Sequence, residues 1–306
     1  MQIIVFIFLC IVWGTTWVAI KVSLEGLPPF FGAASRFSLA LILLFAFIRI
    51  RGVSLKMNRR DFRFVFISAF LMYTLDYGLI YWGEQYLSAG VTAIFFATFP
   101  LFTAIWSNFL FHSEKFNWYK FLGLVLGFCG ILVVFYDQLL QTNFHTKVIL
   151  GSLAIIFGAM GGAMAVVIVK KHLFGVNPLK LSFHQMLQGA FFLFGFGFIM
   201  ENVQTIQLNG RVVFAVFYLG AIGSALAFAL YYWLLQQMSA ITLSLIIYIT
   251  PIVAILVDYL VLGEVIQRQA IIGMFIIFAG ITLTQFGQAT KLRVHFKRRK
   301  PAVKNK

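Results

Sequence analysis

The chain has 306 residues, of which 61% are hydrophobic and only 11% are charged. Soluble domains carry a charge on about a quarter of their residues, so this composition excludes a soluble globular protein. The formal net charge of +15 is confined to segments beside apolar stretches and to the end of the chain. That distribution is typical of membrane orientation and argues against a nucleic-acid-binding protein.

Ten apolar stretches of about 20 residues follow one another, each long enough for a helix to cross a ~30 Å hydrocarbon core. They are apolar on all sides rather than alternating, which favours helices over the strands of a β-barrel. In chain order the predicted helices are 3–20, 30–48, 64–82, 88–111, 119–136, 148–169, 181–200, 212–235, 240–262 and 269–286. The sequence therefore predicts an all-α integral membrane protein with ten transmembrane helices.

The distribution of positive charge predicts the orientation. With the N-terminus in the cytoplasm, nineteen of the 24 lysines and arginines lie in inner loops and in the C-terminal segment, and four lie in outer loops. Because positive residues gather on the cytoplasmic side, both termini are predicted to be cytoplasmic. The basic tail, residues 291–306, is expected to contact anionic lipid headgroups.

The two halves of the chain resemble each other. Tyr81-Trp82, Ser88-Ala89 and Pro100 reappear in the same order as Tyr232-Trp233, Ser239-Ala240 and Pro251. Residues 1–143 and 144–290 are therefore interpreted as two repeats of five helices each. Five is an odd number, so the second repeat enters the membrane from the opposite side, which is the inverted-repeat architecture of many secondary transporters.

Several short motifs carry a family resemblance that covers nearly the whole chain. They are Trp13-Gly14-Thr15-Thr16-Trp17, Ala34-Ser35-Arg36-Phe37, Ser88-Ala89-Gly90-Val91 to Pro100, Glu114 before Gly123, and Pro251 to Leu262-Gly263-Glu264. Together they resemble the EamA-type, ten-helix branch of the drug/metabolite transporter superfamily. The sequence departs from that pattern at His112-Ser113-Glu114, where Leu-Gly-Glu is more usual, and at Asp258, where an apolar residue is usual.

The resemblance implies a carrier in the plasma membrane, commonly an exporter of amino acids, other small metabolites or drugs, that works by alternating access. No G-x-x-x-x-G-K-[ST] motif is present, so the energy is expected from a proton or counter-substrate gradient. One alternative is a flippase for lipids or lipid-linked precursors. A membrane-embedded enzyme is a second alternative, but no catalytic, metal-binding or cofactor motif is found.

Charges inside membrane helices are costly and mark function or a specific pair. Arg36, Asp76 and Asp258 all fall in the outer halves of predicted helices. One interpretation is a polar site in which Arg36 holds a substrate carboxylate or phosphate and an aspartate holds an amine or a proton. The other is a structural Arg36–Asp76 ion pair.

Aromatic residues form a second group of candidates. Trp13 and Trp17 are four residues apart and share one helix face, where they are expected either to line a cavity or to pack. Tyr73 and Tyr248 lie deep in their helices and are candidates for the substrate pathway.

Two prolines, Pro100 and Pro251, fall within predicted helices at equivalent repeat positions. A proline frees a backbone carbonyl and bends its helix, so symmetric kinks that act as hinges are predicted. Glu84, Glu114 and Glu264 lie at helix ends, and the latter two, being equivalent, are expected to cap helices or to bond loops.

Overall fold

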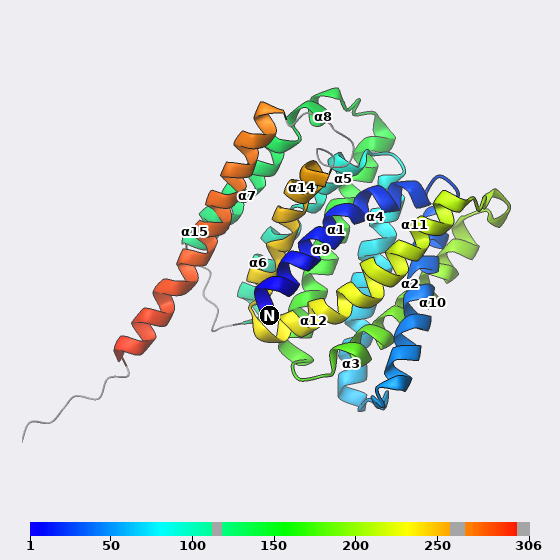
Figure 1. Cartoon of the computed structure of the whole chain (residues 1–306), viewed down its shortest axis with the longest axis horizontal. Coiled ribbons are helices and arrows are strands. Elements are labelled where there is room, and N and C mark those ends of the chain that lie inside the picture. The colour runs from blue at the N-terminus through cyan, green and yellow to red at the C-terminus, as the bar shows by residue number, and fades with distance from the viewer. Residues whose placement is uncertain (112–117, 258–266, 299–306) are drawn as a thin grey trace, which may run out of the picture.

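In the computed structural model, residues 1–111, 118–257 and 267–298 are described, with side chains described up to residue 284 (Figure 1). Asp258 and the segments His112–Glu114 and Leu262–Glu264 lie outside the described residues. The part of the chain that is described contains helices and loops and no strand.

The first half runs through α1 to α8. The helices are α1 (Gln2–Ser23), α2 (Pro29–Ile50), α3 (Arg59–Ala69), a π-helical segment η1 (Phe70–Asp76), α4 (Tyr77–Glu84), α5 (Ala89–Phe96), α6 (Phe99–Leu110), α7 (Trp118–Val134) and α8 (Tyr136–Gln141).

The second half repeats this order. The helices are α9 (Thr146–His172), α10 (Pro178–Met200), the 3₁₀ turn η2 (Val203–Thr205), α11 (Gly210–Gly220), a second π-helical segment η3 (Ala221–Leu226), α12 (Ala227–Gln237), α13 (Ala240–Ser244), α14 (Ile246–Val257) and α15 (Arg268–Arg298).

The predicted all-α membrane fold is confirmed. Within the described residues, seven helical stretches are long and apolar enough to cross a membrane, and three shorter apolar helices complete the ten. Four of the predicted helices are interrupted: two by the π-helical segments and two by short breaks, after α5 and after α13. The last helix is longer than predicted and continues to Arg298, into the segment predicted to be a tail.

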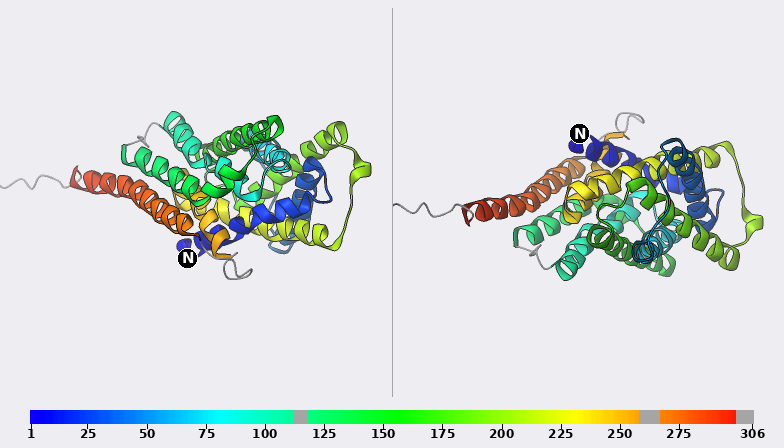
Figure 2. Two further views of the ribbon diagram at one scale, coloured as in Figure 1. Left: turned by 90° about the horizontal axis from the view of Figure 1, so that it is seen from above. Right: turned by 90° about the horizontal axis from the view of Figure 1, so that it is seen from below.

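Equivalent helices of the two halves make equivalent contacts, which is the spatial counterpart of the repeat in the sequence. α2 packs against α10 and α7 against α15, each helix meeting its own counterpart. α1 packs along α14 and α11, while its counterpart α9 packs along α6 and η1. In Figures 1 and 2, α7 and α15 form one edge of the bundle, from which the end of α15 extends.

The same local signals start equivalent helices. Ser88 accepts a hydrogen bond from the Val91 amide at 3.3 Å and Ser239 accepts one from the Thr242 amide at 3.0 Å. Each serine supplies an oxygen to an amide that has no partner within its own helix. α5 and α13 therefore begin at equivalent places.

The kinks at Pro100 and Pro251 stay a prediction, but the helix breaks that the structure shows are not symmetric. The chain leaves its helical path at residues 97–98 in the first half but at Leu245 in the second. Since Ala97 corresponds to Tyr248, these two breaks are not equivalent. Pro251 lies inside α14, and the Thr250 hydroxyl donates to the Ile247 carbonyl at 3.0 Å, the group that the proline leaves without its helical partner. This bond lets the helix continue through the proline.

The N-terminus of α2 is held by the far end of α10. The Glu201 carboxylate accepts hydrogen bonds from the Phe30 amide at 2.8 Å and the Phe31 amide at 3.1 Å. Burial raises the pKa of Glu201, and the two amide donors act in the opposite direction. This carboxylate joins the two helices that pair across the repeat.

Glycines allow α7 and α15 to touch along their backbones. A Cβ atom placed on Gly280 would lie 2.6 Å from the Gly123 carbonyl oxygen and 2.5 Å from the Gly127 amide nitrogen. Small residues permit such close approach between membrane helices, where packing supplies much of the association energy.

Gly280→Ala is expected to destabilise the protein by about 1–3 kcal/mol, because the added methyl group forces two backbones apart. The measurement is the thermal unfolding temperature of detergent-purified protein. Gly195→Ala, on α10 with open space around the added atom, is the matched control and should be neutral. Equal unfolding temperatures for both variants would contradict the packing account.

Candidate functional site

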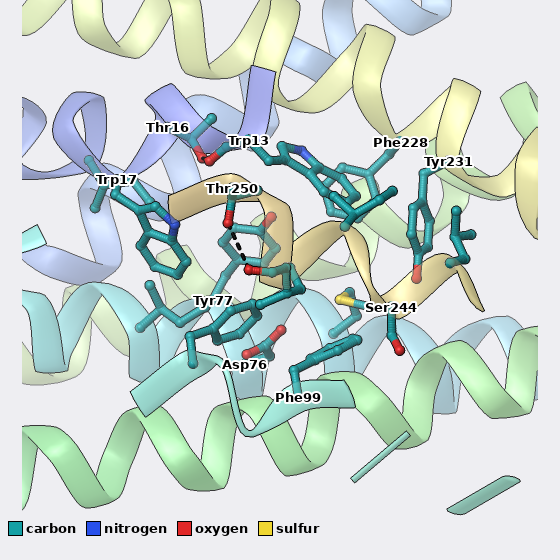
Figure 3. Close-up of a pocket in the computed structure, with 17 residues that line it drawn as sticks. Trp13, Thr16, Trp17, Asp76, Tyr77, Phe99, Phe228, Tyr231, Ser244 and Thr250 are labelled. Atoms are coloured by element: carbon teal, nitrogen blue, oxygen red, sulfur yellow. Dashed lines mark hydrogen bonds between the residues drawn. The ribbon is translucent and has the colours of Figure 1, made fainter. Parts of the chain in front are cut away.

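A small cavity lies between the two halves, with a volume of about 60 Å³, room for only a few water molecules. Helices of both repeats contribute to it, so each half supplies part of the wall. Figure 3 shows Trp13 and Trp17 of α1 on one side and Asp76 and Phe99 on the other. The lining residues are Trp13, Thr16, Trp17, Ile20, Met72, Asp76, Tyr77, Ile80, Phe96, Phe99, Phe228, Tyr231, Leu243, Ser244, Ile246, Ile247 and Thr250.

Asp76 is the acidic residue of this cavity. It ends η1, is 1% exposed, and its Oδ1 atom has no hydrogen-bond partner. π-helical turns are rare and are frequently found at functional sites. An unsatisfied carboxylate in a membrane interior is costly, which makes this oxygen a candidate contact for a substrate or a proton.

Two glycines of α9 make room for the Asp76 carboxyl group. A Cβ atom on Gly158 would lie 3.1 Å from Oδ1, and one on Gly162 would collide with the carboxyl group. The glycines that the sequence indicates only as helix-packing residues therefore also form part of the site.

Arg36 lies behind the cavity wall rather than in it. Its Nε atom donates to Ser224 Oγ at 3.0 Å, and its guanidinium carbon lies 4.9 Å from the centre of the Tyr77 ring. Its Nη1 atom is buried without a hydrogen-bond partner. Tyr77 lines the cavity, so one aromatic ring separates the cavity from the cation.

The predicted Arg36–Asp76 ion pair is not formed in this conformation. Among the described residues the one ion pair within 4 Å joins Arg211 and Glu25, at 3.5 Å on the surface. The polar atoms that Arg36 and Asp76 leave unpaired are therefore free to take other partners.

Trp13 and Trp17 both line the cavity. Trp13 donates its indole N–H to the Gly223 carbonyl at 3.3 Å and packs 5.1 Å from the Tyr231 ring. Trp17 packs edge-on against Phe96 at 5.2 Å. The arrangement offers aromatic surface from both repeats.

Tyr73 and Tyr248 do not reach the cavity. Tyr73 is fully buried behind it, 4.9 Å from the Phe37 ring. Tyr248 turns towards α7 and donates to the Leu124 carbonyl at 2.8 Å, with its ring close to Gly127. Both side chains are packed against neighbouring helices, so their positions are explained by these contacts without a substrate.

Three small hydroxyl residues of the cavity, Thr16, Ser244 and Thr250, were not predicted from the sequence to be site residues. Each hydroxyl bonds a carbonyl of its own helix, at 2.8, 2.8 and 3.0 Å. Such residues are common in membrane helices, so their pattern alone carries no signal for a site. Tyr77 also lines the cavity, but adjacent residues of a helix point in different directions, so its position after Asp76 did not predict this.

A second, larger cavity of about 480 Å³ lies beside the first, at the end of the bundle predicted to be external. Ser88 and Gly90, at the start of α5, and Gln138 and Thr142, in α8 and at its end, are among the residues that line it. Trp17 lines both cavities. Its indole therefore stands between the inner cavity and the outer one.

Comparison with known proteins assigns the architecture to a family. The profile of the EamA-like transporter family matches residues 1–136 and 149–286, once for each half. The chain belongs to the EamA-like transporter family. This is a family of transporters rather than of enzymes, and the chain is a multi-pass membrane transporter.

Relatives agree with this assignment over almost their whole length. The chain is 28% identical to the uncharacterized transporter YoaV of Bacillus subtilis, covering 90% of this chain and 94% of YoaV. It is 26% identical to the uncharacterized inner membrane transporter YedA of Escherichia coli, over 92% of this chain and 89% of YedA. A solved crystal structure superposes with a TM-score of 0.79 at 18% identity, over 95% of this chain and 98% of the other, and shows the same fold.

Replacing Trp17 with Ala is expected to open a path between the two cavities. The test is the rate at which a membrane-impermeant methanethiosulfonate reagent, added to intact cells, modifies a Ser244→Cys thiol in a background lacking Cys10 and Cys129. Because Ser244 lines only the inner cavity, Trp17→Ala should speed labelling severalfold. Labelling at the same rate with and without Trp17 would show that the indole is not the barrier.

Proposed function

We propose that this EamA-family transporter is a secondary exporter of small polar metabolites, with amino acids as the leading class, and that it acts in the plasma membrane. The observation that carries the proposal is the buried Asp76 side chain, which lines a cavity built by both repeats and has a carboxylate oxygen without a hydrogen-bond partner. A carboxylate in such a place favours a substrate with an amino group.

The neighbouring groups fit the remainder of such a substrate. The aromatic walls offer cation–π and apolar contacts to a cationic or flat group. Arg36 carries donors suited to a carboxylate, with Tyr77 between it and the cavity. We propose that Tyr77 turns aside when a substrate enters, which brings the free Nη1 atom within reach.

Alternating access gives the two halves their role. The cavity is too small in this conformation for an amino acid, so binding requires the halves to move apart. α1 and α9 occupy equivalent places, and each packs on the interrupted helices of the opposite half. They are the elements along which the halves would move. Energy would come from a proton or counter-substrate gradient.

Cells expressing the parent chain are expected to accumulate one class of amine-bearing metabolite in the medium, and cells expressing Asp76→Asn are not, because the amide cannot neutralise an ammonium group. The measurement is extracellular metabolite profiling against an empty vector. Glu25→Gln is the matched carboxylate-to-amide control, since this exposed residue pairs only with exposed Arg211, and such pairs contribute little.

Two outcomes would contradict the proposal. If the metabolite profiles of the parent and the empty vector coincide, the chain is not an exporter of the profiled metabolites. If Asp76→Asn exports as the parent does, the Asp76 carboxylate does not bind the substrate. Accumulation of a lipid precursor in the outer leaflet instead of a free metabolite would favour the flippase alternative.

A further inference from the structure

Two buried polar side chains occupy equivalent places in the two repeats. α2 begins at Pro29 and α10 at Pro178, and Arg36 and Gln185 follow seven residues further on. Arg36 is 1% exposed and Gln185 is 0% exposed. Seven residues make about two helical turns, so each side chain lies ~10 Å from the start of its helix. Because α2 begins at the predicted outer end of the bundle and α10 at the predicted inner end, the two side chains lie in opposite halves of the membrane.

A tyrosine stands beside each of these residues. Tyr81 lies beside Arg36, and Tyr232 lies beside Gln185. Tyr81 and Tyr232 are themselves equivalent in the repeat. The two halves therefore build related polar clusters, an outer one around the fixed positive charge of Arg36 and an inner one around the uncharged amide of Gln185.

The inner cluster, here called the Gln185 cluster, joins both halves of the chain. It consists of Ser68 of α3, Tyr73 of η1, Gln185 of α10 and Tyr232 of α12, each at most 1% exposed. Gln185 Nε2 donates to Ser68 Oγ at 2.7 Å. The Tyr73 side chain lies beside that of Tyr232. Two members come from each repeat, so the cluster lies across the interface between the halves.

Several polar atoms of this region are left unpaired. Within the part of the chain that is described, the Tyr73 and Tyr232 hydroxyls and Gln185 Oε1 make no hydrogen bond. One turn to either side of Gln185 on α10, the Ser182 hydroxyl and both amide atoms of Gln188 are buried and equally unpaired. Leaving such groups unpaired in an apolar interior lowers stability. Hydroxyls and amides both donate and accept, so together they suit a polar ligand.

Tyr232 links this cluster to the cavity beside Asp76 and to the inner end of the bundle. Its ring lies 6.0 Å from that of Phe228, which lines the cavity (Figure 3). Tyr232 also lines a small hollow of about 10 Å³, together with Leu181 and Gln236. The hollow lies at the predicted inner end, where α10 begins and α12 ends. A chain of contacts therefore runs from the cavity wall through the cluster to the predicted cytoplasmic end.

The Gln185 cluster is closed in this conformation. The Tyr73 ring packs 5.0 Å from Phe228, and a Cβ atom placed on Gly189 of α10 would collide with the Tyr73 side chain. This packing explains the position of the Tyr73 ring but leaves its hydroxyl unpaired. Moving α10 and α12 away from α3 and η1 would open the cluster and expose its hydrogen-bonding groups to the cytoplasm.

We propose that the Gln185 cluster is the cytoplasmic entry site of the transporter, where an uncharged or zwitterionic metabolite exchanges water for hydrogen bonds on its way to the cavity beside Asp76. The phenol hydroxyls can donate to a carboxylate, and Gln185 Oε1 can accept from an ammonium group. The substrate class rests on the proposed function, whereas the opening of the cluster to the cytoplasm can be measured without a substrate.

The first test is labelling of Ser68→Cys from the two sides of the membrane, in a background lacking Cys10 and Cys129. A membrane-impermeant methanethiosulfonate reagent reaches the cytoplasmic face in everted vesicles and the outer face in intact cells. Ser107→Cys, near the predicted inner end of α6, is the matched control, since Ser107 is also 0% exposed but is not a member of the cluster. In everted vesicles Ser68→Cys should react at least tenfold faster than Ser107→Cys.

The sidedness of labelling decides the outcome. From the outer face Ser68→Cys should show no such advantage, with or without a mixture of the twenty amino acids. Equal rates for the two cysteines in everted vesicles, in both the presence and the absence of the amino acids, would overturn the proposal. Faster labelling of Ser68→Cys from the outer face than from the cytoplasmic face would overturn it as well.

A second variant separates binding from structure. Tyr232→Phe removes a hydroxyl that has no partner among the described residues, so it should unfold at the temperature of the parent. For the amino acid that the parent transports from the mixture, the half-saturating concentration at the cytoplasmic face should rise severalfold. Tyr119→Phe, exposed on α7, is the matched control and should keep the parent value.

An unchanged half-saturating concentration in Tyr232→Phe would overturn the entry site. A fall in the unfolding temperature would show that the hydroxyl is structural, which would also overturn it. Parent vesicles that move no amino acid would contradict the proposed substrate class, and the labelling of Ser68→Cys would still decide whether the cluster opens to the cytoplasm.

Discussion

The cost of placing a charge in lipid is the constraint on which this structure depends. Backbone groups in the bilayer must be paired within helices, and side-chain charges must be paired, capped or functional. The described part of the chain meets the first requirement with helices throughout. It meets the second unevenly, because Lys21 and Lys170 cap helix ends, while Asp76 and Glu84 keep buried oxygens without partners. A buried oxygen without a partner lowers the stability of the fold, so its presence favours a functional role for that side chain.

Inverted symmetry explains how a site between the two halves can become accessible from either side of a membrane. Equivalent helices make equivalent contacts, equivalent lysines cap equivalent turns, and π-helical segments recur at the same place in each half. The departures from symmetry are chemical. Asp76 corresponds to Ala227 and Glu84 to Leu235, so neither of these two buried carboxylates has a counterpart in the second half. The repeat is thus seen in the helices and their contacts, while these two buried carboxylates occur in the first half only at these positions.

Hydropathy and the repeat predicted the ten helices and their division into two halves, because both follow from composition and spacing along the chain. The sequence also indicated Asp76, Trp13 and Trp17, which do line the cavity. It could not show that Tyr248 turns towards α7 or that Arg36 bonds Ser224, because these depend on rotamers and on helix rotation. The π-helical segments change which face of each helix is turned towards its neighbours, and no local sequence pattern predicted these segments. Glu84 looked like an ordinary residue at a helix end until its burial was known.

The central claim is that the two halves move about the cavity so that one end opens as the other closes. The most direct measurement is double electron–electron resonance on two spin-labelled pairs in lipid. One pair joins the exposed positions Gln141 and Gln204 at the outer end, and the other joins Phe109 and Phe174 at the inner end, so each pair spans the two halves. On addition of the amino-acid mixture the two distance distributions should shift in opposite directions. Distributions that shift together, or that do not shift at all, would contradict the account.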